Sequence, residues 1–138
     1  MREWAFVALG SNLGAREEHL AFAREQLALL PDTEVVAASN VEETAPLGPV
    51  SQGPYLNQMV LVRTALSPRD LLSACLAVER ARGRTRGERW GPRTLDLDLV
   101  RYGDAVVTEA DLVVPHPELG RRPFWQRELR ELMPHARD

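Results

Sequence analysis

The chain has 138 residues, of which 44% are hydrophobic and 27% are charged, and its formal net charge is −3. This length and composition predict one globular domain spanning residues 1–138. The negative charge argues against a general nucleic-acid binder, so we expect no nucleic-acid partner. We recognise no signal peptide and no apolar run near the roughly 18 residues that a membrane span requires. We therefore expect a cytoplasmic protein with no membrane partner.

Cys75 is the only cysteine, which excludes an intrachain disulfide and a cysteine-rich zinc site. It falls in an apolar helical stretch, where we expect a buried and inert thiol. All 17 basic residues are arginines. Six of them lie between Arg80 and Arg93, opposed there only by Glu88. Positive charge is therefore concentrated locally in a chain that is acidic overall.

Hydrophobic periodicity predicts the elements in chain order. We expect strands at 4–9, 34–44, 55–64, 95–101 and 105–108, helices at 16–30 and 68–82, and a last helix opened by Pro123. The main part of this order is βαββαβ. It predicts a ferredoxin-like α+β sandwich, in which one mainly antiparallel sheet carries both helices on one face.

Two loops adjoin predicted strands. The first, at 10–14, joins a strand to a helix through glycines, but it lacks the full pattern of a phosphate loop. It is either a tight turn or a support for a ligand through Ser11 and Asn12. The second, at 44–54, is rich in proline and glycine and is either a surface connection or a ligand-binding loop. Tyr55 and Asn57 follow it on one strand face, where they could stack on and hydrogen-bond a heterocycle or simply begin the strand.

The segment RWGPRTLDLDL at 89–99 carries the strongest chemical pattern. Strict alternation puts its leucines on one strand face and Asp96 and Asp98 on the other, roughly 6–7 Å apart. Such a pair favours a hard cation, and Mg²⁺ takes one or two protein carboxylates together with substrate phosphate. The preceding arginines suit anionic oxygens: Arg84, Arg86, Arg89 and Arg93. The alternative is an amphipathic edge strand whose aspartates face water.

Two further residues have open interpretations. Glu79 lies near the end of a helix, where the helix dipole disfavours a carboxylate. It either pairs with an arginine or acts near metal or phosphate. His116 lies between two prolines, which predicts a rigid and exposed side chain. With Arg121 and Arg122 following, it marks either an anion site or an ordinary surface.

Four blocks in this order and spacing resemble 6-hydroxymethyl-7,8-dihydropterin pyrophosphokinase: GSNLG at 10–14, TAPLGP at 44–49 with YLNQ at 55–58, GRTRGERWGPRTLDLDL at 83–99, and VPHPELGRRPF at 114–124. The resemblance implies the ferredoxin-like fold. It also implies transfer of pyrophosphate from ATP to the pterin hydroxymethyl group with release of AMP, in folate biosynthesis. The implied partners are these two small molecules, and we expect a monomer.

The resemblance assigns residues position by position. Asp96 and Asp98 match ligands of two Mg²⁺ ions. Matches to the pterin pocket are Thr44, Pro46, Leu47, Tyr55, Asn57, Trp90 and Phe124. Matches to ATP contacts are Glu79, Arg84, Arg89, Trp90, Arg93, Leu99, Val113, His116 and Arg122. Catalytic matches are Arg84, Arg86, Arg93, Asp96 and Asp98. No residue is assigned as the general base.

Two other functions remain as alternatives. A ferredoxin-like RNA-binding or regulatory module would share the fold, but no strand here shows the aromatic pattern of an RNA-binding strand. A simple ATP:alcohol kinase would share the site and release ADP in place of AMP.

Overall fold

A computed structural model describes residues 1–45, 53–83 and 94–137 of the chain. The predictions for Pro46, Leu47, Arg84, Arg86, Arg89, Trp90 and Arg93 lie outside these ranges. The elements are β1 (Glu3–Ser11), α1 (Arg16–Ala28), β2 (Thr33–Ala38), β3 (Glu42–Thr44), β4 (Tyr55–Thr64), α2 (Pro68–Ala81), β5 (Asp96–Tyr102), β6 (Val107–Glu109), β7 (Leu112–Val114) and α3 (Pro123–Leu132). Short 3₁₀ turns flank α3 at Leu119–Arg121 and Met133–His135.

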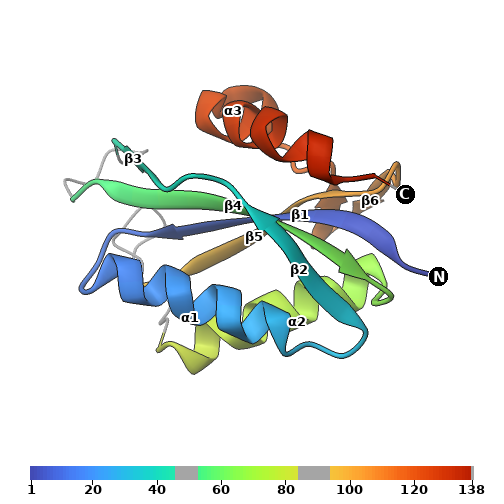
Figure 1. Cartoon of the computed structure of the whole chain (residues 1–138), viewed down its shortest axis with the longest axis horizontal. Coiled ribbons are helices and arrows are strands. Elements are labelled where there is room, and N and C mark those ends of the chain that lie inside the picture. The colour runs from blue at the N-terminus through green and yellow to red at the C-terminus, as the bar shows by residue number, and fades with distance from the viewer. Residues whose placement is uncertain (46–52, 84–93, 138) are drawn as a thin grey trace.

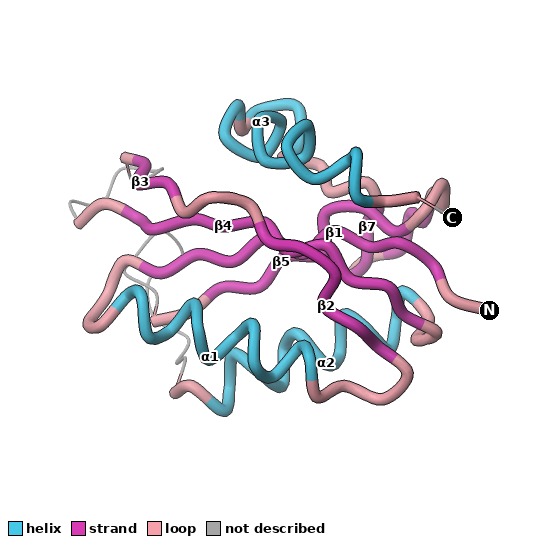
Figure 2. Tube along the Cα trace, in the orientation of Figure 1, coloured by secondary structure: helices cyan, strands magenta, loops and turns pink. Residues whose placement is uncertain are grey.

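The central sheet has the order β2-β4-β1-β5, and β3 also pairs with β4. All these pairings are antiparallel. The helices α1 and α2 cover one face and α3 lies across the other (Figures 1 and 2). The predicted ferredoxin-like α+β sandwich is confirmed, and the last helix adds a partial layer on the second face.

Alternation along the strands builds a separate core on each face of the sheet. Toward α1 and α2, β1 buries Val7 and Leu9 against Leu20, Leu71 and neighbouring residues. Toward α3, the same strand buries Phe6 and Ala8 with Trp125 and Leu129. Each strand of the centre therefore has apolar side chains on both faces, as an inner strand of a three-layer arrangement requires.

The predicted strand at 34–44 is wrong in its length, because it breaks into β2 and β3. Ser39 causes the break. Its backbone N–H donates to Met59 O and its hydroxyl accepts from Met59 N, both at 2.9 Å. The side chain thus takes over a ladder contact, and the next residue, Asn40, donates its N–H to Glu131 of α3 at 3.0 Å.

Three smaller predictions also need correction. The first helix ends at Ala28, since the residue before Pro31 disfavours helical backbone. The strand expected at 105–108 starts later and forms a hairpin with β7. The apolar pattern of α2 also predicts a buried Leu76, but this residue is 41% exposed, because it lies one residue past the stripe formed by Leu71, Cys75 and Val78.

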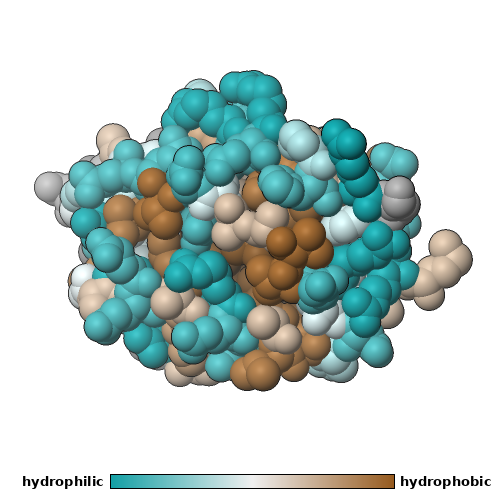
Figure 3. Space-filling view, in the orientation of Figure 1, coloured by the Kyte–Doolittle hydropathy of each residue, from teal (hydrophilic) through white to brown (hydrophobic). Residues whose placement is uncertain are grey.

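No helix in the described ranges is both long and apolar enough to cross a bilayer. The surface in Figure 3 is largely hydrophilic, with apolar side chains gathered over β2 and the end of α1. That region includes Leu29 and Val36, which are 75% and 37% exposed. β2 is an edge strand, and its register shifts at Val36. Such a bulge interrupts the regular edge that another strand could join.

Candidate active site

Two carboxylates project from β5 onto the α3 side of the sheet. Leu97 and Leu99 point to the other side, where they are 2% and 3% exposed. Alternation therefore directs Asp96 and Asp98 to the α3 side, where both are partly accessible. The predicted arrangement of this strand is confirmed, whereas the metal role of the two carboxylates stays a prediction.

Glu79 of α2 holds β5 from the opposite face. Its side chain is only 4% exposed, and its Oε2 accepts a hydrogen bond from the Leu97 N–H at 2.7 Å. Hydrogen bonds to a charged acceptor are stronger than neutral ones. Because Leu97 lies between the two aspartates, this bond fixes the backbone that carries them. Glu79 is therefore placed to position the site through the β5 backbone, a role that its sequence context does not reveal.

Gly10 lies next to the carboxylates and has no side chain. It lies opposite Asp96 on β5 and opposite Asn57 on β4. A Cβ at this position would lie 3.4 Å from Tyr55 Cδ1 and 3.5 Å from Asn57 Oδ1. Gly10 is itself buried, so the Tyr55 and Asn57 side chains pack closely over it, and a larger residue would displace them. Gly10 is not among the predicted site residues, although glycine inside a strand often marks the close approach of a ligand.

Thr44 and Asn57 form the next part of this surface. Asn57 is 7% exposed, and its Nδ2 donates to Thr44 Oγ1. Thr44 lies opposite Tyr55 in the β3–β4 ladder. The structure thus gathers three predicted pterin residues at one end of the sheet, next to Gly10.

His116 adjoins the carboxylate side. Its Nε2 lies 3.7 Å from Asp98 Oδ1, which is beyond hydrogen-bond distance. Its Nδ1 accepts from the Glu118 N–H at 3.0 Å, which places the proton of the neutral ring on Nε2. Burial, and then the charge of Arg122, lower the pKa of His116. The lowered pKa favours the neutral ring, which directs the N–H of Nε2 toward Asp98.

The prediction that His116 is exposed is wrong. Its side chain is 23% exposed, and the ring packs edge-on against Trp125 with centroids 5.0 Å apart. The peptide bond between Val114 and Pro115, just before it, is cis. α3 covers the histidine through Trp125.

The start of α3 brings Arg122 and Phe124 to the same side of the sheet. The Arg122 guanidinium lies 4.4 Å from the centroid of the Trp125 ring, a cation–π contact. Its buried Nε has no hydrogen-bond partner among the described residues. Phe124 meets Trp125 edge-on at a centroid distance of 6.4 Å. Two residues predicted for different substrates, Arg122 and Phe124, thus share one aromatic support.

Asn12 and Arg16 fasten the chain that enters β4. Asn12 Nδ2 donates to Gly53 O at 3.2 Å. Arg16 Nη1 donates to Pro54 O at 2.9 Å, and its Nη2 pairs with Glu43 at 3.2 Å. Asn12 thus holds protein backbone, and a ligand-supporting role for this loop stays a prediction. Arg16 is not among the predicted residues, because an arginine opening a helix has no distinguishing pattern.

Two predicted ATP residues lie away from the carboxylate surface. The side chain of Leu99 is buried on the α1–α2 side, and Val113 is 37% exposed in the β6–β7 hairpin. The assignment of these two residues to ATP stays a prediction. Ser11 is fully buried, and its hydroxyl has no hydrogen-bond partner in the described part of the chain.

The donors on this surface suit Mg²⁺. Asp96 and Asp98 offer hard carboxylate oxygens, and Mg²⁺ completes its shell with water and phosphate. Across residues 1–45, 53–83 and 94–137, no group of three or more His, Cys, Asp or Glu side chains could hold a metal. A cation that needs only two protein carboxylates fits this pair.

Phosphoryl transfer uses groups of the kinds found here: carboxylates that can hold a divalent cation, an arginine, and an imidazole that can donate a hydrogen bond. The α+β fold and these side chains are thus compatible with an enzyme of the phosphoryl-transfer class. Residues 6–134 match the family described as 7,8-dihydro-6-hydroxymethylpterin-pyrophosphokinase. The chain belongs to this family.

Relatives from three bacteria support the same family assignment. The chain is similar to 2-amino-4-hydroxy-6-hydroxymethyldihydropteridine pyrophosphokinases from Synechocystis sp. (44% identity over 130 residues), Methylorubrum extorquens (42% over 130) and Pseudomonas aeruginosa (40% over 137). These alignments cover 94%, 94% and 99% of this chain. They span 66%, 82% and 85% of the respective relatives, so the chain is shorter than each of them.

Proposed function

We propose that this chain transfers pyrophosphate from ATP to the hydroxymethyl group of 6-hydroxymethyl-7,8-dihydropterin and releases AMP, a step of folate biosynthesis. The family match over residues 6–134 carries the proposal. The surface around Gly10 supports it, since carboxylates, an amide and aromatic residues meet on one sheet face.

Asp96 and Asp98 are the residues that would hold Mg²⁺, with two ions in all. When bound, the metal neutralises phosphate oxygens and lowers the pKa of a hydroxyl that it contacts. Glu79 maintains the geometry of these ligands through Leu97 N–H. The carboxylates themselves bind and orient, and neither needs to carry a proton.

The pterin occupies the β3–β4 side of the surface. Asn57 hydrogen-bonds the edge of the heterocycle, and its orientation is set by Thr44. Tyr55 and Phe124 contact the two ring faces, since aromatic rings favour offset stacking on a flat heterocycle. Gly10, which has no side chain, lets Tyr55 and Asn57 pack closely above it. The remaining pterin residues in this proposal are Pro46, Leu47 and Trp90.

The triphosphate lies on the β5 side. Arg122 and the neutral His116 donate hydrogen bonds to phosphate oxygens and so stabilise the charge that develops there. The other residues proposed for ATP are Arg84, Arg89, Trp90, Arg93, Leu99 and Val113, and Arg84, Arg86 and Arg93 are also proposed as catalytic. The hydroxymethyl oxygen forms a bond to the β-phosphorus while the bond from that phosphorus to the α,β-bridging oxygen breaks. The bridging oxygen leaves with AMP, and the hydroxyl proton passes to solvent. All these residues belong to one copy of the chain, so we propose that a monomer is active.

The test is a nucleotide product assay. The protein is mixed with ATP, Mg²⁺ and 6-hydroxymethyl-7,8-dihydropterin, and AMP is separated from ADP. We expect AMP that depends on the pterin and disappears when Mg²⁺ is chelated. Pterin-dependent ADP would show simple phosphorylation, and neither product from folded protein would favour a binding module.

A further inference from the structure

A glutamate on α3 is buried against the sheet without a donor. Glu128 is 1% exposed, and neither of its carboxyl oxygens has a hydrogen-bond partner among the described residues. Phe124 lies four residues earlier, so both side chains are on the same face of the helix. An ionised carboxylate is strongly disfavoured in such a place, because nothing replaces the water that it loses.

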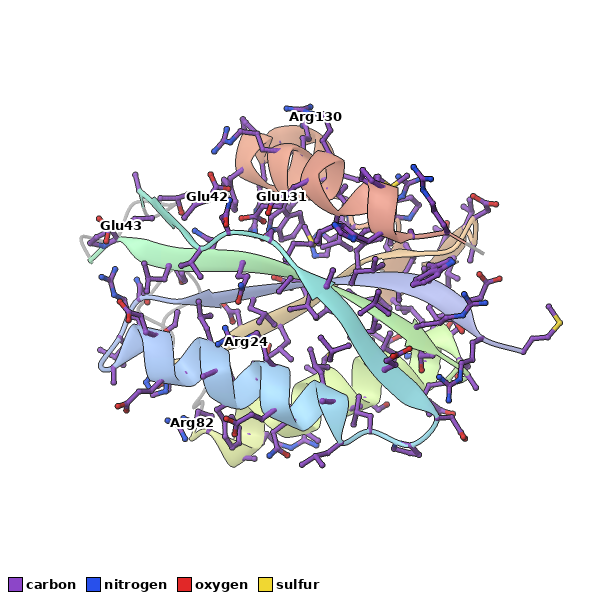
Figure 4. The ribbon with its side chains drawn as sticks, in the orientation of Figure 1. Arg24, Glu42, Glu43, Arg82, Arg130 and Glu131 are labelled. Carbon is purple, nitrogen blue, oxygen red and sulfur yellow. The ribbon has the colours of Figure 1, made fainter. Side chains whose placement is uncertain are left out.

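The carboxyl group that interacts with Glu128 is Glu42 of β3, which the residue before Glu128, Arg127, also contacts. Glu42 Oε1 accepts from Arg127 Nη2 at 2.9 Å, so one arginine already neutralises Glu42. Figure 4 shows Glu42 and Glu131 in the layer between the sheet and α3, and Arg130 pointing away from the sheet. A contact between two carboxyl groups becomes a hydrogen bond only when one of them carries a proton.

The other groups around Glu128 do not supply that proton or a compensating charge. The charged neighbours on α3 are Arg127, which pairs with Glu42, and Glu131, which accepts from Asn40 N–H. β4 presents Met59 and Leu61 to the core on this face, and neither side chain titrates. One arginine therefore faces three carboxyl groups, and the most buried of the three is left without a cation.

We propose that Glu128 is a positioning residue, held as a neutral acid whose proton is shared with Glu42, and that this contact ties α3 to β3. The inference rests on the proposed function, because α3 carries Phe124 and β3 carries Thr44 on opposite sides of the pterin. The shared proton fixes the distance between α3 and β3. Glu128 itself touches neither substrate.

The titration of the group agrees with this geometry. Burial, followed by the hydrogen bond to Glu42 and its charge, raises the pKa of Glu128 from 4.5 to about 9. The folded state therefore holds a proton that the unfolded chain releases above about 4.5. The stability that this proton contributes is complete below that pH and is lost as the pH rises through about 9. Above that pH two carboxylates repel each other between α3 and β3.

Glu128→Gln tests the protonation state without any assay of activity. Glutamine is neutral at every pH and keeps an N–H donor for Glu42. We expect the infrared carbonyl band of a protonated carboxyl at pH 7, its loss in Glu128→Gln, and its retention in Glu25→Gln, an exposed control on α1. The melting temperature of Glu128→Gln should rise relative to wild type as the pH increases from about 5 to about 9. A parallel pH dependence in both proteins would overturn the proposal.

The positioning role is tested through the pterin. The wild-type KM for pterin should rise several-fold between about pH 8 and about pH 10, while that of Glu128→Gln stays constant. Glu128→Ala, which has no donor, should show a raised KM at neutral pH with little change in kcat. Equal KM profiles for wild type and Glu128→Gln would overturn the role. Absence of pterin-dependent AMP in wild type would instead refute the proposed function, and the infrared and melting experiments would still decide the state of Glu128.

Discussion

Two buried glutamates, one on each face of the sheet, satisfy their carboxyl groups in different ways. Glu79 on α2 is 4% exposed and accepts from a backbone N–H of β5. Glu128 on α3 is 1% exposed and faces Glu42, a second carboxyl. The first can remain charged because it has a donor, whereas the second needs a proton. Burial alone therefore does not determine the charge of a glutamate in this fold, and the partner does.

The two faces also differ in how far they are covered. α1 and α2 lie along one face, whereas α3 alone lies on the other (Figure 2). The 10 residues of α3 form a helix about 15 Å long, while the 10 residues of β4 extend over about 33 Å. A helix of this length covers about half of the strand. The half of this face beyond α3 carries Gly10, Asn57 and the two aspartates, of which the aspartates are partly accessible.

The largest effect on activity is expected at the two aspartates of β5. Asp98→Asn removes a charged metal ligand, and we expect pterin-dependent AMP formation to fall by more than about 100-fold. The Asp98 side chain is 38% exposed, so heat unfolding should change little. Asp104→Asn, in an exposed turn, is the matched control and should retain activity. Activity of the variant within tenfold of wild type would show that Asp98 holds no essential metal.

Gly10→Val tests whether the absence of a side chain at Gly10 is needed for pterin binding. The added methyl groups meet Tyr55 and Asn57, since a Cβ alone already lies 3.4 Å from Tyr55. Because Tyr55 and Asn57 are proposed pterin contacts, their displacement should raise the KM for pterin about tenfold, which corresponds to about 1.4 kcal/mol of binding free energy. Gly120→Val is the control, because nothing lies within 4 Å of a Cβ at that position. An unchanged KM for pterin would mean that the substrate does not bind beside Gly10.

Local patterns predict much of this arrangement. The leucine–aspartate alternation of β5 and the bounds of β4 follow from periodicity alone. The start of α2 follows from Ser67, whose hydroxyl accepts from Asp70 N–H at 3.1 Å. Each of these features depends on residues within a few positions of one another, and that is why the sequence reveals them.

Features that depend on distant residues are not predictable in this way. The break between β2 and β3 arises because Ser39 bonds Met59, 20 positions away. The burial of His116 arises because Trp125 packs against its ring. Gly10 acquires its role only when β1 pairs with β4 and β5. Sequence periodicity does not reveal contacts between distant residues. The surroundings of Gly10 and the burial of His116 therefore become visible only in the structure.

The contrast between the two glutamates is sharpened by the same substitution on each. Glu79→Gln keeps an acceptor oxygen but loses its charge, so we expect a modest loss in the free energy of unfolding. Glu79→Ala leaves the Leu97 N–H buried without a partner and should cost about 1–3 kcal/mol. Glu128→Gln should cost nothing at pH 7 and should stabilise the protein at higher pH. Urea unfolding of the three variants measures these differences. A larger loss for Glu128→Gln than for Glu79→Gln would reverse the comparison.

The smallest effect is expected at Cys75, in the fully covered face. Its side chain is completely buried on α2. Burial, followed by the charges of Glu79 and Asp98, raises the pKa of the Cys75 thiol to about 12. Because the thiolate is the reactive form, a thiol reagent should leave the native protein unmodified at pH 8 and react fully after denaturation. ATP and pterin should not alter this protection, since their proposed site is on the other face. Rapid native modification, or modification that substrates block, would show that α2 opens together with the site and that the two faces are not independent.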